Sequence, residues 1–151
     1  MIQRIQTVYL ALAVIMLVFC CCMGLAEFEP VGMGLSSTMY SLMLINGEGT
    51  VESYLPSVLF GIVVVTELVS VLAIMNYHNR RGQMKLCTVA MICNLLWVAC
   101  FAGLTVMLKG DATVHPCFAS CLPVIAFVLT FLARRAIKSD DELVRSADRI
   151  R

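Results

Sequence analysis

LPSVLFGIVVVTELVSVLAIMNY, residues 55–77, decides the fold, because it is apolar along its length except for one charged residue, Glu67. A helix needs about 20 such residues to cross the ~30 Å hydrocarbon core of a bilayer. Runs of similar length and character occupy residues 5–26, 86–108 and 116–133. The sequence therefore predicts an all-α membrane protein built as a bundle of four transmembrane helices.

The composition favours the same class of protein. Of the 151 residues, 60% are hydrophobic and 14% are charged, and the mean hydropathy is +0.90. A soluble fold would have to bury four long helices that are apolar on every side, and a chain this short has too little interior for that. We expect residues 1–151 to form a single integral membrane domain.

The basic residues lie almost entirely on one side of the four runs. They precede the first run, separate the second from the third, and follow the fourth: Arg4, Arg80, Arg81, Lys85, Arg134, Arg135, Lys138, Arg145, Arg149 and Arg151. On the other side, Lys109 is the only base, and residues 27–54 carry glutamates without any base. Because cytoplasmic loops retain Lys and Arg, both termini are expected to be cytoplasmic.

The outer segment, residues 27–54, has the pattern of a short extracytoplasmic β-hairpin. Residues 37–45 are moderately apolar, Asn46-Gly47-Glu48-Gly49 is a strong turn signal, and residues 50–54 resume with β-formers. An isolated hairpin is marginal in water, so its apolar side chains are expected to lie on the helix ends or the lipid surface. These side chains include Leu42, Leu44 and Val51. The alternative is an exposed edge that pairs with a partner strand.

Glu67 is the only charged residue inside the apolar runs. An ionised carboxylate is costly there, so Glu67 is expected to be protonated or paired. Asn94 lies at a similar depth on the next, antiparallel run, and a neutral Glu67 that donates to Asn94 would hold the two helices together. The alternative is a proton or cation site, although the runs contain no second acid, histidine or base to receive a proton.

Small residues four apart indicate where the second and third runs touch. Ser57 and Gly61 lie in the second run, and Ala99 and Gly103 lie in the third. Because close helix approach in lipid relies on small side chains, we expect these pairs to face each other. Trp97, in the middle of the third run, is expected to pack inside the protein.

The eight cysteines indicate neither a metal site nor a cofactor. The later ones form no C-x-x-C pair: Cys87, Cys93, Cys100, Cys117 and Cys121. The two histidines fall on opposite sides of the membrane, so no zinc site can be assembled, and thiols inside a bilayer act as small apolar side chains. A disulfide is geometrically possible where the first helix ends and the fourth begins, between Cys117 and one of Cys20, Cys21 or Cys22.

Residues 134–151 are expected to form a cytoplasmic C-terminal helix. Ser139, followed three residues later by Glu142, has the pattern of a capping box, so a new helix is expected to begin there. This helix would either lie on anionic headgroups through its arginines or dock onto a partner. The docking residues would be Leu143, Val144, Arg145, Ala147, Asp148 and Ile150.

The two ends of the chain carry a family resemblance. The opening MIQRIQTVYL, residues 1–10, and the closing ELVRSADRIR, residues 142–151, resemble the ends of the bacterial family catalogued as domain of unknown function 4293. The resemblance implies a four-helix integral protein of the bacterial inner membrane. It brings no catalytic residue to this sequence.

Three classes of function remain. A structural or accessory subunit of a larger bacterial membrane complex fits the small size and the distinctive ends, and it is preferred. The alternative is a small proton- or cation-coupled transporter or channel that uses Glu67. An enzyme is not expected, because the sequence has no G-x-S-x-G elbow, no paired carboxylates at one depth and no histidine-based site. The expected contacts are membrane lipid and a membrane-protein partner or second copy, but not nucleic acid, because the bases follow the membrane surface.

Overall fold

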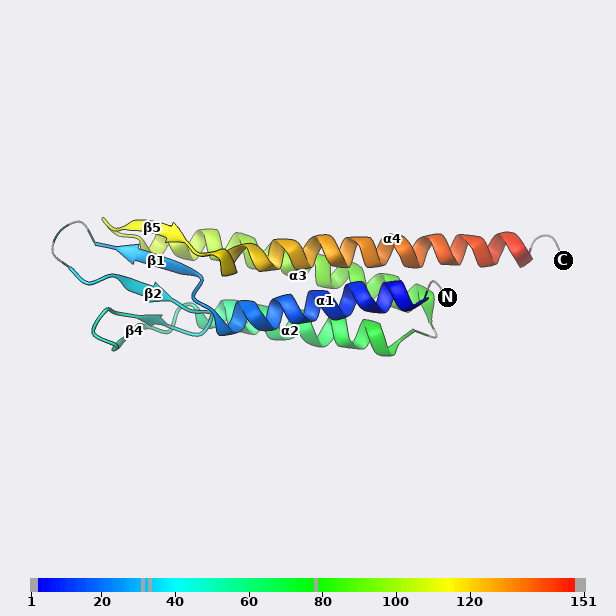
Figure 1. Ribbon diagram of the computed structural model, residues 1–151, viewed down its shortest axis with the longest axis horizontal. Helices are drawn as coiled ribbons and strands as arrows, with labels where there is room; N and C mark the ends of the chain where they lie inside the picture. The colour runs from blue at the N-terminus through cyan, green and yellow to red at the C-terminus, as the bar shows by residue number, and fades with distance from the viewer. Residues whose placement is uncertain (1–2, 31, 33, 78, 149–151) are drawn as a thin grey trace.

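The long helices α1 to α4 run side by side along the molecule (Figure 1). The computed structural model describes residues 3–30, 32, 34–77 and 79–148. Its helices are α1 (Gln3–Cys22), α2 (Ser57–Met75), α3 (Arg80–Leu108) and α4 (Leu122–Asp148). All four are long and apolar enough to cross a membrane. The predicted number and approximate positions of the helices are confirmed.

The two ends of the bundle differ in charge. The N-terminus, the C-terminus and the turn between α2 and α3 lie at one end, and the other connections lie at the opposite end (Figure 1). We call the first the basic end, because the helix segments nearest to it carry Arg80, Arg81, Lys85, Arg134, Arg135 and Lys138. We call the second the sheet end. The charge segregation along the sequence is therefore also a segregation in space.

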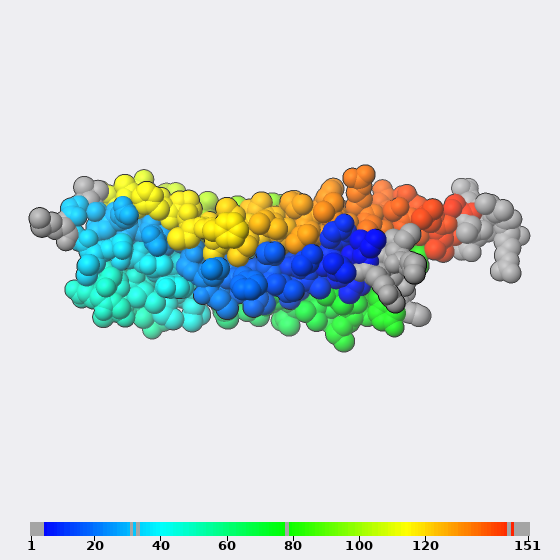
Figure 2. Space-filling model, viewed as in Figure 1, coloured from blue at the N-terminus to red at the C-terminus, as the bar shows by residue number. Residues whose placement is uncertain are grey.

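Each helix packs against two neighbours, since α1 and α3 both contact α2 and α4. Figure 2 shows α1 lying along α4 on one face of the molecule. The side chains that point outwards are apolar as well, and several are at least half exposed: Val65, Leu68, Leu72, Ile92, Leu95 and Leu96. A helix that is hydrophobic on all sides suits lipid rather than water.

The predicted first and fourth runs differ from the helices at the sheet end. The first was expected to reach Ala26, but α1 ends at Cys22 and Ala26 opens a strand. Leu25 is already bound to the sheet, because its N–H donates to the Met39 carbonyl (2.7 Å) and its carbonyl accepts from the Cys117 N–H (2.9 Å). The fourth run was expected from Pro116, but that residue ends a strand, and the 3-10 turn η1 (Phe118–Cys121) precedes α4.

A five-stranded antiparallel sheet lies beyond the helices, in the order β4-β3-β2-β1-β5. The strands are β1 (Ala26–Glu29), β2 (Ser37–Met39), β3 (Leu44–Ile45), β4 (Val51–Ser53) and β5 (Thr113–Pro116). The expected turn over residues 46–49 is confirmed between β3 and β4, where the Asn46 N–H donates to the Thr50 carbonyl (2.9 Å). Gly49 has φ +79°, a backbone conformation that favours glycine.

The prediction of a lone two-stranded hairpin is wrong, because the sheet is larger. Residues 37–45 form two strands rather than one, and β1 and β5 enlarge the sheet. β5 lies in the connection between α3 and α4. It pairs with β1, which places Glu27 opposite His115 although the two residues are far apart in the sequence. The larger sheet buries Leu44, whereas Leu42 and Val51 remain about 40% exposed (42% and 41%).

The expected second helix at the C-terminus is also wrong, because α4 continues without a break past residue 139. The apparent capping box therefore lies inside a helix. Asp140 is 8% exposed, and its carboxylate accepts a hydrogen bond of 2.7 Å from the Gln6 side-chain amide of α1. Asp140, which lies within a pattern typical of a helix start, instead makes a tertiary contact between α4 and α1.

Candidate functional site

The middle of the bundle holds three buried polar atoms that have no hydrogen-bond partner among the described residues. They are Oε1 of Glu67, Nδ2 of Asn94 and Nε1 of Trp97. An unpartnered buried polar group costs about 1–3 kcal/mol, so each of these atoms needs an explanation. Trp97 is 1% exposed and stacks on Phe101 with ring centroids 5.3 Å apart, which confirms its expected packing role.

The hydrogen bond expected between Glu67 and Asn94 is not formed. The buried face of α2 is centred on Val63, Thr66 and Ser70, so Glu67 lies at its flank. Asn94 belongs to the buried face of the adjacent helix α3, whereas Glu67 is not part of the buried face of α2.

The predicted helix contact through small residues is wrong. Ser57, Gly61, Ala99 and Gly103 are all exposed, and a Cβ added at either glycine would meet no described heavy atom within 4 Å. Small side chains do lie on the buried faces of α2 and α3, but at other positions: Thr66, Ser70, Ala73, Cys87 and Ala90. Thr66 and Ser70 satisfy their hydroxyls within α2 by donating to the Ile62 and Thr66 carbonyls (2.7 and 2.8 Å).

All eight cysteines are free thiols, so the possible disulfide to Cys117 is not present. Burial, together with the nearby Glu27 carboxylate, raises the pKa of the Cys117 thiol. Its thiolate fraction at neutral pH is therefore lowered, which slows thiol–disulfide exchange. In the part of the chain that the structure describes, no three His, Cys, Asp or Glu side chains gather where they could hold a metal ion.

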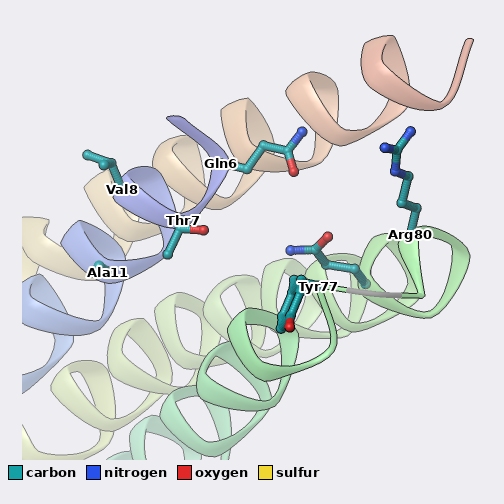
Figure 3. A pocket seen from close by; sticks show the side chains of 7 residues that line it. Gln6, Thr7, Val8, Ala11, Tyr77 and Arg80 are labelled. Carbon is teal, nitrogen blue, oxygen red and sulfur yellow. The ribbon is translucent and has the colours of Figure 1, made fainter. Parts of the chain in front are cut away.

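A cleft of about 520 Å³ opens at the basic end between α1 and the turn that joins α2 to α3. Its lining combines polar and apolar side chains: Gln6, Thr7, Val8, Ala11, Tyr77, Arg80 and Gln83. Figure 3 shows the α1 residues on one side of this cleft and Tyr77 and Arg80 on the other. The volume lies in the range typical of small-molecule sites, ~300–1,000 Å³.

Hydrogen bonds from two helices tie the walls of this cleft to α4. The Gln6 amide donates to the Asp140 carboxylate, and Arg80 Nη1 donates to the Asp140 backbone carbonyl (3.2 Å). Sequence reasoning did not find this site. The polar residues Gln6 and Gln83 near the helix ends were its only local signal, and residues from three separate segments meet only in the folded chain.

The C-terminal residues expected to dock are only partly described. Leu143 and Val144 are 56% and 45% exposed on α4. Arg145, Ala147 and Asp148 belong to the same helix, and Ile150 lies outside the described residues. Leu143 and Val144 are therefore accessible on the surface of α4.

Comparison with known proteins places the chain in a family. No curated protein matches it. A family model described as "Domain of unknown function (DUF4293)" matches residues 2–150, which is nearly the whole chain. The four apolar helices agree with what the resemblance of the chain ends implied. This protein belongs to the DUF4293 family.

Proposed function

We propose that this protein is an integral protein of the bacterial inner membrane and an accessory subunit of a larger membrane complex. In this proposal the basic end faces the cytoplasm, in keeping with the retention of Lys and Arg on that side. The observation that carries the proposal is the free end of α4, which extends past the bundle with two exposed apolar side chains.

The hydrogen bond between Gln6 and Asp140 aligns α4 with the start of α1. Only three residues of α1 precede Gln6, whereas α4 continues for eight residues beyond Asp140, to Asp148. At 1.5 Å per residue, these eight residues add about 12 Å of helix. The last turn of α4 therefore lies beyond the start of α1, as Figure 1 shows.

Leu143 and Val144 lie on this projecting end, beside the exposed Glu142 and Ser146. Because α4 is one continuous helix, its end points along the bundle rather than across the membrane surface. This direction favours a protein partner over the headgroup layer as the contact for the two side chains. A buried Leu or Val side chain contributes about 1.5–3 kcal/mol, so the pair can anchor a partner helix.

Replacing both residues with glutamine tests the proposal. Affinity purification from native membranes in mild detergent is expected to recover a stoichiometric partner with the intact chain. Recovery should fall at least tenfold with Leu143→Gln/Val144→Gln, since about 1.4 kcal/mol corresponds to a factor of ten. Mass spectrometry of the eluates measures this ratio.

The matched control is Lys138→Gln/Glu142→Gln, which removes an exposed ion pair (3.8 Å) on the same stretch of α4. The partner should be retained with this variant. Truncation after Lys138 is a poorer test, because it also removes Asp140 and its contact with Gln6. Recovery of the chain alone, or of the same partner from both double variants, would contradict the proposal.

A second candidate function is a proton- or cation-coupled transporter or channel centred on Glu67. It is favoured by the unpartnered Oε1 of Glu67 and Nδ2 of Asn94 in the bundle. A proton or cation at Glu67 would give its Oε1 a partner. The Nδ2 of Asn94 is a hydrogen-bond donor and would need an oxygen acceptor instead.

This candidate predicts proton or cation flux in proteoliposomes that contain the purified chain. Glu67→Gln should reduce the flux at least tenfold, because the amide cannot ionise. Glu52→Gln, at an exposed position in β4, should leave it unchanged. Flux that is absent from the intact chain, or equal in both variants, would exclude this function.

A further inference from the structure

We propose that the cleft at the basic end binds the phosphate diester of a phospholipid headgroup. The proposal goes beyond subunit docking, and it requires only that the bundle sits in a membrane. The cleft lies where the headgroup layer would meet the helix ends, because its polar walls come from the first turns of α1 and α3.

Gln83 supplies an uncharged hydrogen-bonding group in the wall of the cleft. The residue is 3% exposed and lines the cleft. Its primary amide has two N–H donors and a carbonyl oxygen that accepts. A phosphate oxygen within reach of this amide could accept a hydrogen bond from it.

Arg80 supplies the charge. Its guanidinium is half-buried, and one of its nitrogens donates to the Asp140 backbone carbonyl. Among the described residues it forms no ion pair with a carboxylate. The guanidinium has five N–H donors in a planar fork that matches two phosphate oxygens, so donors remain for an anion.

The acid next to the cleft is Asp140, on α4. Its carboxylate accepts the hydrogen bond of the Gln6 amide, and it is 8% exposed. Gln6 lines the cleft, whereas Asp140 is not among its lining residues. Gln6 also offers its side-chain oxygen to the hydroxyl or ammonium group that a phospholipid headgroup carries beside its phosphate.

The order of residues along the cleft matches the structure of a phospholipid. Gln6 and Thr7 are near the start of α1, and Ala11 lies one turn deeper (Figure 3). Val8 lines the cleft and is 53% exposed on the outside of the bundle. A headgroup among the polar side chains would leave its acyl chains along this apolar surface, which inorganic phosphate could not use.

The test is native mass spectrometry of the purified, delipidated chain titrated with phosphatidylglycerol. One lipid is expected to bind the intact chain, and Arg80→Gln is expected to weaken its binding at least tenfold. Arg81→Gln is the matched control, because it makes the same charge change at the next residue, which is exposed and lines a different cleft with Met84, Lys85 and Arg134. It should leave the affinity unchanged.

Gln83→Met gives a second variant, which replaces the buried amide with an apolar side chain of similar length. It should weaken lipid binding several-fold while the fold is retained, so the proposal stays testable even if Arg80→Gln does not fold. A parallel titration with inorganic phosphate separates the two sources of the phosphate group.

Lipid binding that depends on Arg80 and Gln83 but not on Arg81 would support the proposal. An equal loss in Arg80→Gln and Arg81→Gln would show only attraction to a basic surface and would overturn it. Binding of inorganic phosphate without lipid would also overturn the assignment to a phospholipid. Each result is obtained on the isolated chain, so it is independent of whether a protein partner is found.

Discussion

Trp97→Ala is expected to lower the free energy of unfolding by about 3 kcal/mol. Buried aromatic residues typically cost ~3–5 kcal/mol when truncated, and the lower end applies in lipid, where lost packing rather than exposure to water sets the cost. Trp97 is 1% exposed, belongs to the larger buried cluster, and stacks on Phe101 at an interplanar angle of 6°. Its removal would leave a cavity between the helices.

Titration of the purified protein with SDS in mixed micelles measures this free energy. Labelling by a maleimide dye, measured separately at Cys20 and Cys87 by peptide mass spectrometry, reports unfolding, because both thiols are fully buried in the folded protein. The exposed Cys22 and Cys121 react before the protein unfolds and are not part of this readout. Leu96→Ala is the control, since the neighbouring side chain is 52% exposed and should cost less than about 1 kcal/mol.

Trp97→Phe refines this prediction. Phenylalanine keeps most of the ring and removes the indole N–H that has no partner among the described residues. The variant should therefore lose much less stability than Trp97→Ala. Equal costs for Trp97→Ala and Leu96→Ala would show that α3 does not turn Trp97 into the bundle.

Asp140→Ala is expected to lower the free energy of unfolding by about 1.5–3 kcal/mol, the usual range for a buried hydrogen bond to a charged group. The substitution leaves the Gln6 amide, which is 4% exposed, without its acceptor at 2.7 Å. It also separates the start of α1 from α4. The same SDS titration measures the effect.

Two further variants test whether the hydrogen bond between Asp140 and Gln6 causes this effect. Asp140→Asn keeps an oxygen that can accept a hydrogen bond from Gln6. Its loss in free energy of unfolding should therefore be less than half of the loss caused by Asp140→Ala. Glu142→Ala removes only an exposed ion pair with Lys138 and should cost no more than about 0.5 kcal/mol. If Asp140 and Glu142 were equally dispensable, the contact between α1 and α4 at the basic end would be in doubt.

The capping box shows why some sequence signals failed. Ser139 and Glu142 have the spacing of a helix start, but the backbone of α4 already supplies the hydrogen bonds that a cap would provide. Asp140, one of the two acidic residues between them, accepts a hydrogen bond from Gln6, which lies 134 positions earlier in the chain. A local pattern carries no information about such a distant partner.

The predictions about the small residues and about the partner of Glu67 failed for a related reason. Hydrophobicity on every side of α2 and α3 gives no periodic stripe, so the sequence does not reveal which face turns inward. Gly61 and Gly103 were expected inside but face outward, while Thr66 and Asn94 occupy the buried faces. The depth of Glu67 followed from counting residues, but its direction did not.

The sequence by itself determined the number of helices, their approximate lengths and the grouping of basic residues at one end. Those features depend on run length and composition, because lipid requires each spanning segment to satisfy its own backbone hydrogen bonds and to be apolar throughout. Only the tertiary structure decided the strand pairing of β1 with β5, the rotation of each helix and the cleft at the basic end. These arise where segments far apart in the chain meet, and packing between them selects one arrangement that no single segment specifies.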